Sequence, residues 1–142
     1  FSLFLTGSEA NRKATKAFLD RHPHLNATSL AGNVTLAELA WLFSRAECVV
    51  SVNTGILHLA ALAGCPTIAL NGPTNPLRWG PVGEICLSLL PHNPHSAYLN
   101  LGFEYGSHKK HPCMQDLAPG DVIAALKKLG VIPENTQAFS AQ

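Results

Sequence analysis

Residues 49–61 read Val-Val-Ser-Val-Asn-Thr-Gly-Ile-Leu-His-Leu-Ala-Ala, and this stretch decides the fold. It opens with an apolar, β-branched run, which is typical of a strand buried inside a parallel sheet. The run breaks at Asn53-Thr54-Gly55 and resumes as an apolar stretch that suits a helix packed on the sheet. A strand that leads into a helix through such a turn leaves unpaired backbone N–H groups at the helix start. Those groups and the helix dipole favour an anion, most often a phosphate.

Two residues of this stretch are expected to meet the anion. Gly55 lets the anion approach the backbone, because a side chain there would obstruct it, and we expect this glycine to take a positive φ in the turn. His58 lies about one turn into the helix, within reach of the same anion.

A second strand pattern, Thr67–Leu70, follows at once and ends in the loop 71–76, which reads Asn-Gly-Pro-Thr-Asn-Pro. In a parallel sheet, the loop after this strand and the turn at 53–55 fall at the carboxyl ends of adjacent strands. That edge is where open α/β sheets bind their ligands.

Strand and helix patterns alternate outward from this stretch. Ahead of it we expect a strand at 1–5, a helix at 10–21, a short strand at 25–30, a helix from Thr35 and a strand at 48–52. Thr35 and Glu38 have the capping-box spacing that marks a helix start. The alternation predicts an α/β fold, a Rossmann-like parallel sheet of about five or six strands with helices on both faces.

The second half of the chain is less regular. We expect a loop at 77–83, a strand at 85–90, a long loop at 91–112, and an amphipathic helix from Pro119 to Leu129 that Gly130 caps. The sequence therefore predicts one Rossmann-like domain over residues 1–132 and a flexible C-terminal tail over 133–142.

The composition excludes two classes of protein. The 142 residues carry a formal net charge of +1, which argues against an electrostatic nucleic-acid binder, so we expect no nucleic-acid partner. No apolar run approaches the ~18 residues of a membrane span. The chain begins at Phe1 inside an apparent strand, and we expect it to be a piece of a longer protein.

The cysteines and histidines give no clear metal motif. Cys48, Cys65, Cys86 and Cys113 are irregularly spaced, which favours free buried thiols over a zinc site. The pattern His92-x-x-His95 and the run 108–113, His-Lys-Lys-His-Pro-Cys, could bind a metal, but their polar surroundings favour solvated loop histidines. We therefore expect no metal and no other cofactor.

Two runs carry a resemblance to a known family. Residues 51–61, followed by 66–76, resemble the bacterial heptosyltransferases, which are the lipopolysaccharide inner-core glycosyltransferases of family 9. Their signature is close to S-x-D-T-G-x-x-H-x-x-A, with G-P-T-D-P after the next strand. The turn Leu30-Ala31-Gly32 and the run Pro112-Cys113-Met114 also look like theirs, and the resemblance covers most of residues 1–130.

The resemblance implies an architecture and a set of site residues. It implies the C-terminal, donor-binding half of a GT-B enzyme, whose donor is typically ADP-L-glycero-D-manno-heptose. Carried over by motif, Glu9 accepts hydrogen bonds from the ribose hydroxyls, and Val34 lies by the adenine. Thr54 and Gly55 present amides to the diphosphate, and His58 contacts phosphate or sugar.

Asn53 is the one departure from the signature, which has an aspartate there. Asparagine keeps the size and one acceptor of aspartate, but it loses the charge and gains a donor. If the aspartate binds sugar hydroxyls, Asn53 can partly replace it in the donor site. If its charge orients the donor or balances a developing cation, activity suffers.

Each of these residues also has a purely structural interpretation. Glu9 near a helix start can simply stabilise the helix dipole. His58 can be a core histidine with satisfied hydrogen bonds. Residues 53–55 can be an N-capped turn, which does not exclude anion binding.

Two functions follow from the sequence. The preferred one is the donor domain of an inverting glycosyltransferase, with a nucleotide-sugar donor, a lipid-linked saccharide acceptor, and a general base in an N-terminal acceptor-binding domain of the same protein. Such an enzyme is expected in the cytoplasm or peripherally at the inner face of the inner membrane. The alternative is a non-catalytic module that binds a nucleotide or phospho-sugar, or docks on a partner, and keeps the fold without the chemistry.

Overall fold

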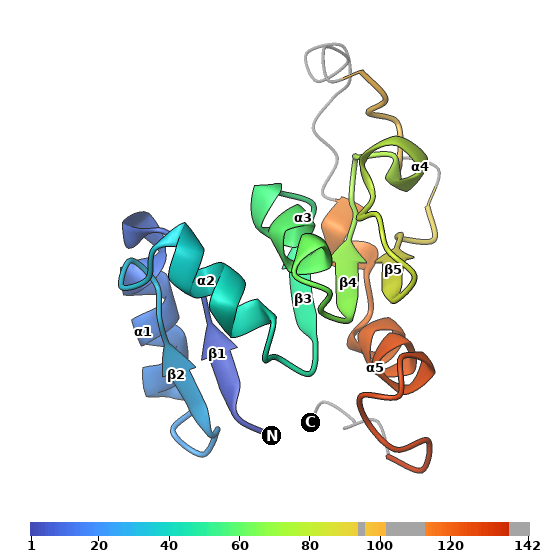
Figure 1. Ribbon diagram of the computed structural model, residues 1–142. Coiled ribbons are helices and arrows are strands. Elements are labelled where there is room, and N and C mark those ends of the chain that lie inside the picture. Colours follow the sequence, from blue (N-terminus) through green and yellow to red (C-terminus); the bar gives the residue numbers. More distant parts are fainter. Residues whose placement is uncertain (94–95, 102–112, 137–142) are drawn as a thin grey trace. The chain divides into compact units, whose positions relative to one another are not determined.

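The computed structural model describes residues 1–93, 96–101 and 113–136. The chain divides into two compact units, residues 1–39 and 40–142, and each is an assembly of parallel strands and helices (Figure 1). The predicted α/β class with parallel strands is therefore confirmed. The strands are hydrogen-bonded as one sheet of two and one of three, so the prediction of a single sheet of five or six is wrong for the described residues.

The first unit is built on a short parallel pair. Strand β1 (Leu3–Leu5) pairs with β2 (Ala27–Ser29), and helix α1 (Arg12–Arg21) packs against β2. A 3₁₀ turn, η1 (Glu9–Asn11), precedes α1, where the sequence predicted helix from residue 10. The Thr15 hydroxyl lies 2.8 Å from that of Ser29, which ties the helix to the strand.

Two backbone hydrogen bonds extend this pairing beyond the strand ends. Leu30 donates to the carbonyl of Leu5, and Gly32 donates to the carbonyl of Gly7, both at 2.9 Å. The loop after β1 and the turn after β2 are thereby held against each other. This is the local framework around Glu9.

Helix α2 (Leu36–Phe43) begins with the predicted capping box. The backbone N–H of Thr35 donates to Glu38 Oε2 at 2.8 Å, and the backbone N–H of Glu38 donates to Thr35 Oγ1 at 3.2 Å. The bond from the Thr35 backbone, and a further one from the Thr35 hydroxyl to Glu38 Oε2 at 2.8 Å, hold the pKa of Glu38 below its usual value, and the backbone bond contributes most. The boundary between the two units falls inside this helix, after Leu39.

The second unit is a three-stranded parallel sheet in the order β3-β4-β5. The strands are β3 (Val49–Val52), β4 (Thr67–Leu70) and β5 (Cys86–Leu89). Helix α3 (Gly55–Leu62) packs on β3 and β4, and helix α5 (Pro119–Lys128) packs on β4 and β5. The core of the unit lies between these layers, and its fully buried side chains include Leu57 and Ile68.

Two short helices were not foreseen. Helix α4 (Pro76–Trp79) occupies part of the predicted loop 77–83, because Asn75 Oδ1 accepts from the Leu77 amide at 3.0 Å and Pro76 takes the first helical position. The 3₁₀ turn η3 (Cys113–Asp116) precedes α5. The domain limits 1–132 and 133–142 stay a prediction, and most of the expected tail lies outside the described residues.

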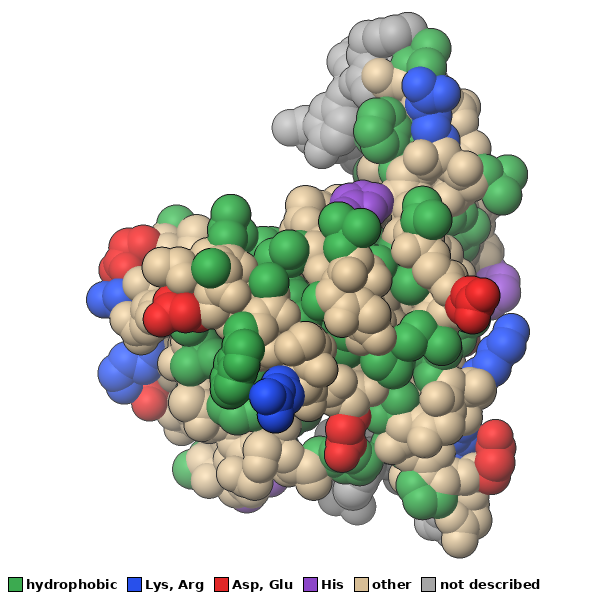
Figure 2. Space-filling view, in the orientation of Figure 1, with side chains coloured by type: hydrophobic (Ala, Val, Ile, Leu, Met, Phe, Trp, Pro, Cys, Tyr) green, Lys and Arg blue, Asp and Glu red, His purple; other side chains and the backbone are tan. Residues whose placement is uncertain are grey.

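The distribution of charged side chains on the surface agrees with the small net charge of the sequence. On the face shown in Figure 2, cationic and anionic side chains are interspersed instead of gathered in a patch of one sign. Among the helices that the structure describes, none is long and apolar enough to cross a membrane.

A pair of glycines tests the turn that leads from α3 into β4. Gly64 has φ +75°, where an L side chain is strained, so Gly64→Ala is expected to lower the free energy of unfolding by about 1–2 kcal/mol. Gly120 in α5 has ordinary φ and open space around its Cα, so Gly120→Ala is expected to raise it by about 0.4–1 kcal/mol. Urea denaturation measures both, and equal effects would contradict the role of the Gly64 turn.

Candidate functional site

The candidate site lies at the carboxyl ends of β3 and β4, as the sequence predicted. The two strands pair in register with Val52 opposite Leu70, so their ends meet at one edge of the sheet. Residues 53–54 follow β3 directly and lead into α3, and residues 71–75 follow β4 and lead into α4. The turn at 53–55 and the loop at 71–76 are thus neighbours in the second unit.

A buried asparagine joins these two loops. Asn71 is fully buried, and its Oδ1 accepts a hydrogen bond from Asn53 Nδ2 at 2.8 Å. The Thr74 hydroxyl donates to the same oxygen at 3.4 Å. Asn71 Nδ2 faces the carbonyls of Ala69 and Leu89, at 3.4 and 3.5 Å. Asn71 was expected only as part of the loop after the strand, although a polar side chain directly after a buried strand was a usable signal.

The start of α3 is open to a ligand. Thr54 is the N-cap residue, but its side chain makes no capping hydrogen bond, and the Asn53 side chain bonds to Asn71. The side-chain N-cap interpretation of residues 53–55 is therefore wrong. The Thr54 carbonyl accepts from the Leu57 amide at 3.0 Å, while the N–H groups of Gly55 and Ile56 have no helical partner by the geometry of a helix start.

Gly55 keeps the approach to these amides free. The expected positive φ is wrong, because positive φ among the described glycines occurs at Gly32, Gly64 and Gly130. Gly55 is instead the first residue of α3 and adopts the helical conformation without special strain. A Cβ built on Gly55 would meet no protein atom within 4 Å, so a side chain there would fill the space in front of the helix start.

His58 lies on α3 near this opening. It is half-buried, whereas its helix neighbours Leu57 and Ala60 are fully buried in the core. In the part of the chain that the structure describes, no hydrogen bond or ion pair engages the His58 ring. The core-histidine interpretation therefore receives no support from satisfied hydrogen bonds.

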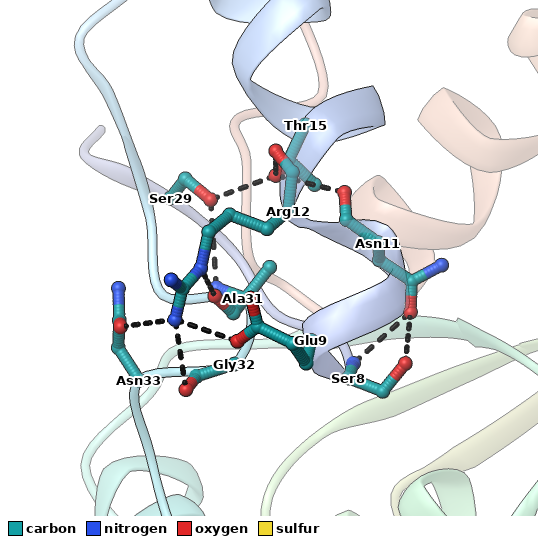
Figure 3. A network of polar contacts seen from close by, with 9 residues as sticks. All are labelled: Ser8, Glu9, Asn11, Arg12, Thr15, Ser29, Ala31, Gly32 and Asn33. Carbon is teal, nitrogen blue, oxygen red and sulfur yellow. Dashed lines mark hydrogen bonds and ion pairs between the residues drawn. The ribbon is translucent and has the colours of Figure 1, made fainter.

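Glu9 belongs to a separate network in the first unit, which Arg12 organises (Figure 3). The Arg12 Nη2 lies 2.7 Å from Glu9 Oε2, and it donates to Asn33 Oδ1 at 2.9 Å and to the Gly32 carbonyl at 3.2 Å. Its Nε donates to the Ala31 carbonyl at 3.4 Å. Arg12 was missed in the sequence, because three of these four partners lie about twenty residues away along the chain.

Gly32 fits this network closely. Its φ of +70° and the closeness of the Glu9 Cα, 2.8 Å from where a Cβ would stand, require a glycine at the turn. Val34 follows the turn and is half-buried, directly before the capping box of α2. The exposed ion pair to Arg12 gives Glu9 a structural role and leaves its ribose role a prediction.

The predicted site residues therefore fall into two groups. Asn53, Thr54, Gly55 and His58 lie together around the start of α3 in the second unit, and Glu9 and Val34 lie in the first. That both groups contact one ligand stays a prediction.

The four cysteines are free thiols. Cys65 and Cys113 are buried, as expected, and Cys48 and Cys86 are half-buried. Burial raises the pKa of Cys48 to about 11, and the nearby Cys65 adds to the rise. Burial likewise raises the pKa of Cys65 and Cys86. At neutral pH these three thiols are protonated, which makes them poor nucleophiles and poor metal ligands.

The described residues hold no metal-binding cluster. Within 1–93, 96–101 and 113–136, no three His, Cys, Asp or Glu side chains are grouped to hold an ion. His95, His108 and His111 of the candidate metal patterns lie outside these ranges. A cavity beside the end of β4 has a purely apolar lining, formed by Leu70, Met114, Leu117, Ala118, Pro119, Val122 and Ile123, which offers no polar side chain to a nucleotide.

Comparison with known proteins gives a consistent picture. A model of glycosyltransferase family 9 (heptosyltransferase) matches residues 1–102. The chain is 29% identical over 113 residues to the lipopolysaccharide core heptosyltransferase OpsX of Haemophilus influenzae, a match that covers 76% of this chain and 33% of that protein. It is 28% identical over 113 residues to lipopolysaccharide heptosyltransferase 3 of Escherichia coli, covering 80% and 32%. The chain thus spans about a third of the length of these curated relatives.

Solved structures share the fold. A glycosyl transferase family 9 protein from Veillonella parvula superposes with a TM-score of 0.76 at 17% identity, over 92% of this chain and 37% of that one. The ADP-heptose lps heptosyltransferase II of E. coli superposes with a TM-score of 0.73 at 21% identity, over the same shares. At these identities the likeness concerns the fold alone.

The Arg12 network predicts that replacing Arg12 or Lys16, two cationic residues of α1, will lower the stability of the protein by different amounts. Arg12 joins Glu9 to three oxygens of the turn 31–33, so Arg12→Ala is expected to lower the free energy of unfolding by about 1 kcal/mol, after discounting for its half-exposed side chain. Lys16 makes only an exposed pair with Asp20, so Lys16→Ala should change it by less than about 0.5 kcal/mol. Thermal melting of both variants checks this, and matching shifts would show that Arg12 is another surface cation.

Proposed function

Because the chain belongs to glycosyltransferase family 9, the heptosyltransferase family, we propose that it is the donor-binding part of an enzyme that transfers heptose to lipopolysaccharide core. The proposed donor is a nucleotide sugar of the ADP-heptose type. The proposed whole protein is a GT-B enzyme, in which an N-terminal domain binds the lipid-linked saccharide acceptor. We place this enzyme at the cytoplasmic side of the inner membrane.

The observation that carries the proposal is the open start of α3. The Gly55 and Ile56 amides have no helical partner, the Thr54 hydroxyl leaves them uncapped, and no protein atom fills the space at Gly55. A diphosphate fits these donors, because the unpaired amides and the helix dipole both favour negative charge. His58, one turn further on, supplies a second donor to phosphate or sugar oxygens.

The proposed reaction is an inverting displacement. The acceptor hydroxyl oxygen forms a bond to the anomeric carbon, the bond from that carbon to the donor phosphate oxygen breaks, and the nucleoside diphosphate leaves with the electron pair. A general base takes the hydroxyl proton, and we assign this base to the N-terminal domain. The start of α3 and His58 stabilise the charge that develops on the leaving diphosphate.

The nucleoside is assigned to the first unit. Glu9 is proposed to accept hydrogen bonds from the ribose hydroxyls, and Val34 to lie by the adenine. The Arg12 ion pair supports this role for Glu9 indirectly, because it fixes the carboxylate on the turn that precedes Val34. Asn53, at the end of β3, is proposed to face the sugar.

A second candidate is a binding module without transferase activity. The neutral Asn53, placed where the family signature has an aspartate, favours it, because the carboxylate charge is missing. A turnover assay with ADP-heptose and a lipopolysaccharide core acceptor on the full-length protein separates the two. Donor binding without turnover would support the module.

The chain alone is expected to bind ADP weakly and to transfer nothing. Half of a two-domain cleft buries less of the ligand than the whole, so the Kd should be on the order of hundreds of micromolar or higher. Titration calorimetry on the folded chain measures this. If the folded chain bound no ADP at millimolar concentration, the proposal that it binds a nucleotide would be wrong.

Variants of α3 distinguish a site from a core role. His58→Ala in the full-length enzyme is expected to cost about 1.5–3 kcal/mol of donor binding or transition-state stabilisation, with little change in melting temperature. Gly55→Val should weaken donor binding sharply, because its side chain occupies the approach to the amides. Leu62→Ala is the matched control, since Leu62 is 84% exposed at the far end of the same helix.

Donor affinity and thermal melting are measured together for the three variants. A large fall in melting temperature for His58→Ala with unchanged donor affinity would make His58 a core residue and defeat its assignment.

A further inference from the structure

The amide pair Asn53–Asn71 is an unusual feature of the site edge. Asn71 is fully buried, yet its side chain is polar, and the proposed donor site lies only a few residues from its partner Asn53. A buried amide is costly unless its hydrogen bonds are made, so each group around Asn71 has a defined role.

The surroundings fix which way the Asn71 amide points. Its Nδ2 faces the backbone carbonyls of Ala69 and Leu89, and carbonyl oxygens can only accept hydrogen bonds. Turning the amide around would place Oδ1 against two acceptors. Asn71 Oδ1 must therefore face Asn53 and Thr74, which both donate to it.

This orientation sets a requirement at position 53. The side chain there has to offer a hydrogen-bond donor to Asn71 Oδ1, and the Asn53 amide does so at 2.8 Å. An ionised carboxylate of the same shape has no proton to give. Its oxygen would face Asn71 Oδ1, so two hydrogen-bond acceptors would lie against each other beside a buried side chain.

We propose that Asn71 is a positioning residue of the donor site. Its oxygen holds the turn before α3 by accepting a hydrogen bond from an N–H donor at position 53. An ionised carboxylate at position 53 cannot make this bond and is therefore disfavoured there. The pair fixes the Asn53 side chain directly before the open amides of α3. With one Nδ2 hydrogen used on Asn71, Asn53 keeps its own oxygen for a hydroxyl of the ligand, since a phosphate has no proton to offer it at neutral pH. This inference rests on the proposed donor function.

The test uses Asn53→Asp in the full-length protein, because this change keeps shape and alters only charge and donor capacity. Burial and the facing Asn71 oxygen raise the pKa of the introduced carboxyl above the ordinary value of about 3.9. Below the folded-state pKa, its protonated form donates to Asn71 as the amide does. The defect is therefore smallest at low pH and grows as the pH rises through the folded-state pKa.

Donor affinity is measured for ADP-heptose by calorimetry at a temperature where all variants are folded. At about pH 8, Asn53→Asp should bind about tenfold more weakly than the unsubstituted protein, and the difference between the two should shrink as the pH is lowered toward about 4.5. The described partners of the pair, Ala69, Leu89 and Thr74, are uncharged. His58, on α3, is present in both proteins.

Asn75→Asp is the matched control. Asn75 lies on the same loop, its oxygen caps the Leu77 amide, and its Nδ2 donates to the exposed Asn100, whose own Nδ2 donates to the Tyr98 carbonyl at 3.5 Å. An aspartate keeps the capping acceptor, so this variant should bind the donor within about twofold of the unsubstituted protein at both pH values.

A double-mutant cycle isolates the role of Asn71. Asn71→Ala should weaken donor binding although Asn71 does not touch the ligand, and in its background the pH dependence of Asn53→Asp should shrink to the part that direct repulsion between the carboxylate and the diphosphate causes. A pH-independent effect of Asn53→Asp, or the same pH dependence with and without Asn71, would overturn the positioning role. If the unsubstituted protein bound neither ADP nor ADP-heptose, the donor function itself would fail, which the same titrations show separately.

Discussion

The buried side chain of Asn71 is the constraint on which the site edge depends. It sits directly after β4, where its backbone N–H donates to the Leu89 carbonyl at 2.9 Å and continues the pairing with β5 beyond the last strand residue. Its side chain then connects the ends of all three strands, through Asn53 after β3, Ala69 in β4 and Leu89 in β5. No buried side-chain nitrogen or oxygen among the described residues lacks a partner, so this connection is complete. A complete network specifies one arrangement of the loops, which a purely apolar edge would not do.

Local sequence patterns predicted many of the helices and strands, but they did not predict how distant segments pair. The capping box at Thr35 and Glu38 involves only neighbours in sequence, so its residue types sufficed. The strand Thr67–Leu70 was found from its apolar run alone, although its pairing partners β3 and β5 are distant in sequence. Helix α4 was missed because Gly80, Pro81 and Gly83 directly after it indicate a loop, although Asn75 and Pro76 together are a helix start. The division of the strands between two sheets depends on hydrogen bonding between distant segments, which periodicity does not encode.

In the candidate site, too, the features set by local sequence were predicted and those set by distant partners were not. The turn 53–55 and the loop after β4 were found because both follow strands, and parallel strands end at one edge. Arg12 and Asn71 were not found, because their roles depend on partners about twenty residues away. The open start of α3 could not be predicted from the residue type at its N-cap. Thr54 has the residue type of a good N-cap, but its hydroxyl makes no capping bond, and the neighbouring amide is used by Asn71.

The neutral pair also changes the electrostatics of the helix start. Two unit charges 4 Å apart interact by on the order of 1 kcal/mol in water and 4 kcal/mol near a protein surface, so a carboxylate at position 53 would oppose a diphosphate on the adjacent amides. Asn53 removes that repulsion and leaves the helix dipole and amides to act on the anion alone. It also removes a charge that would stabilise positive charge developing at an anomeric carbon. Under the proposed donor function, Asn53 in place of the aspartate of the family signature therefore favours ground-state binding of the donor at the expense of transition-state stabilisation, which is the physical difference between a binding module and a transferase built on the same fold.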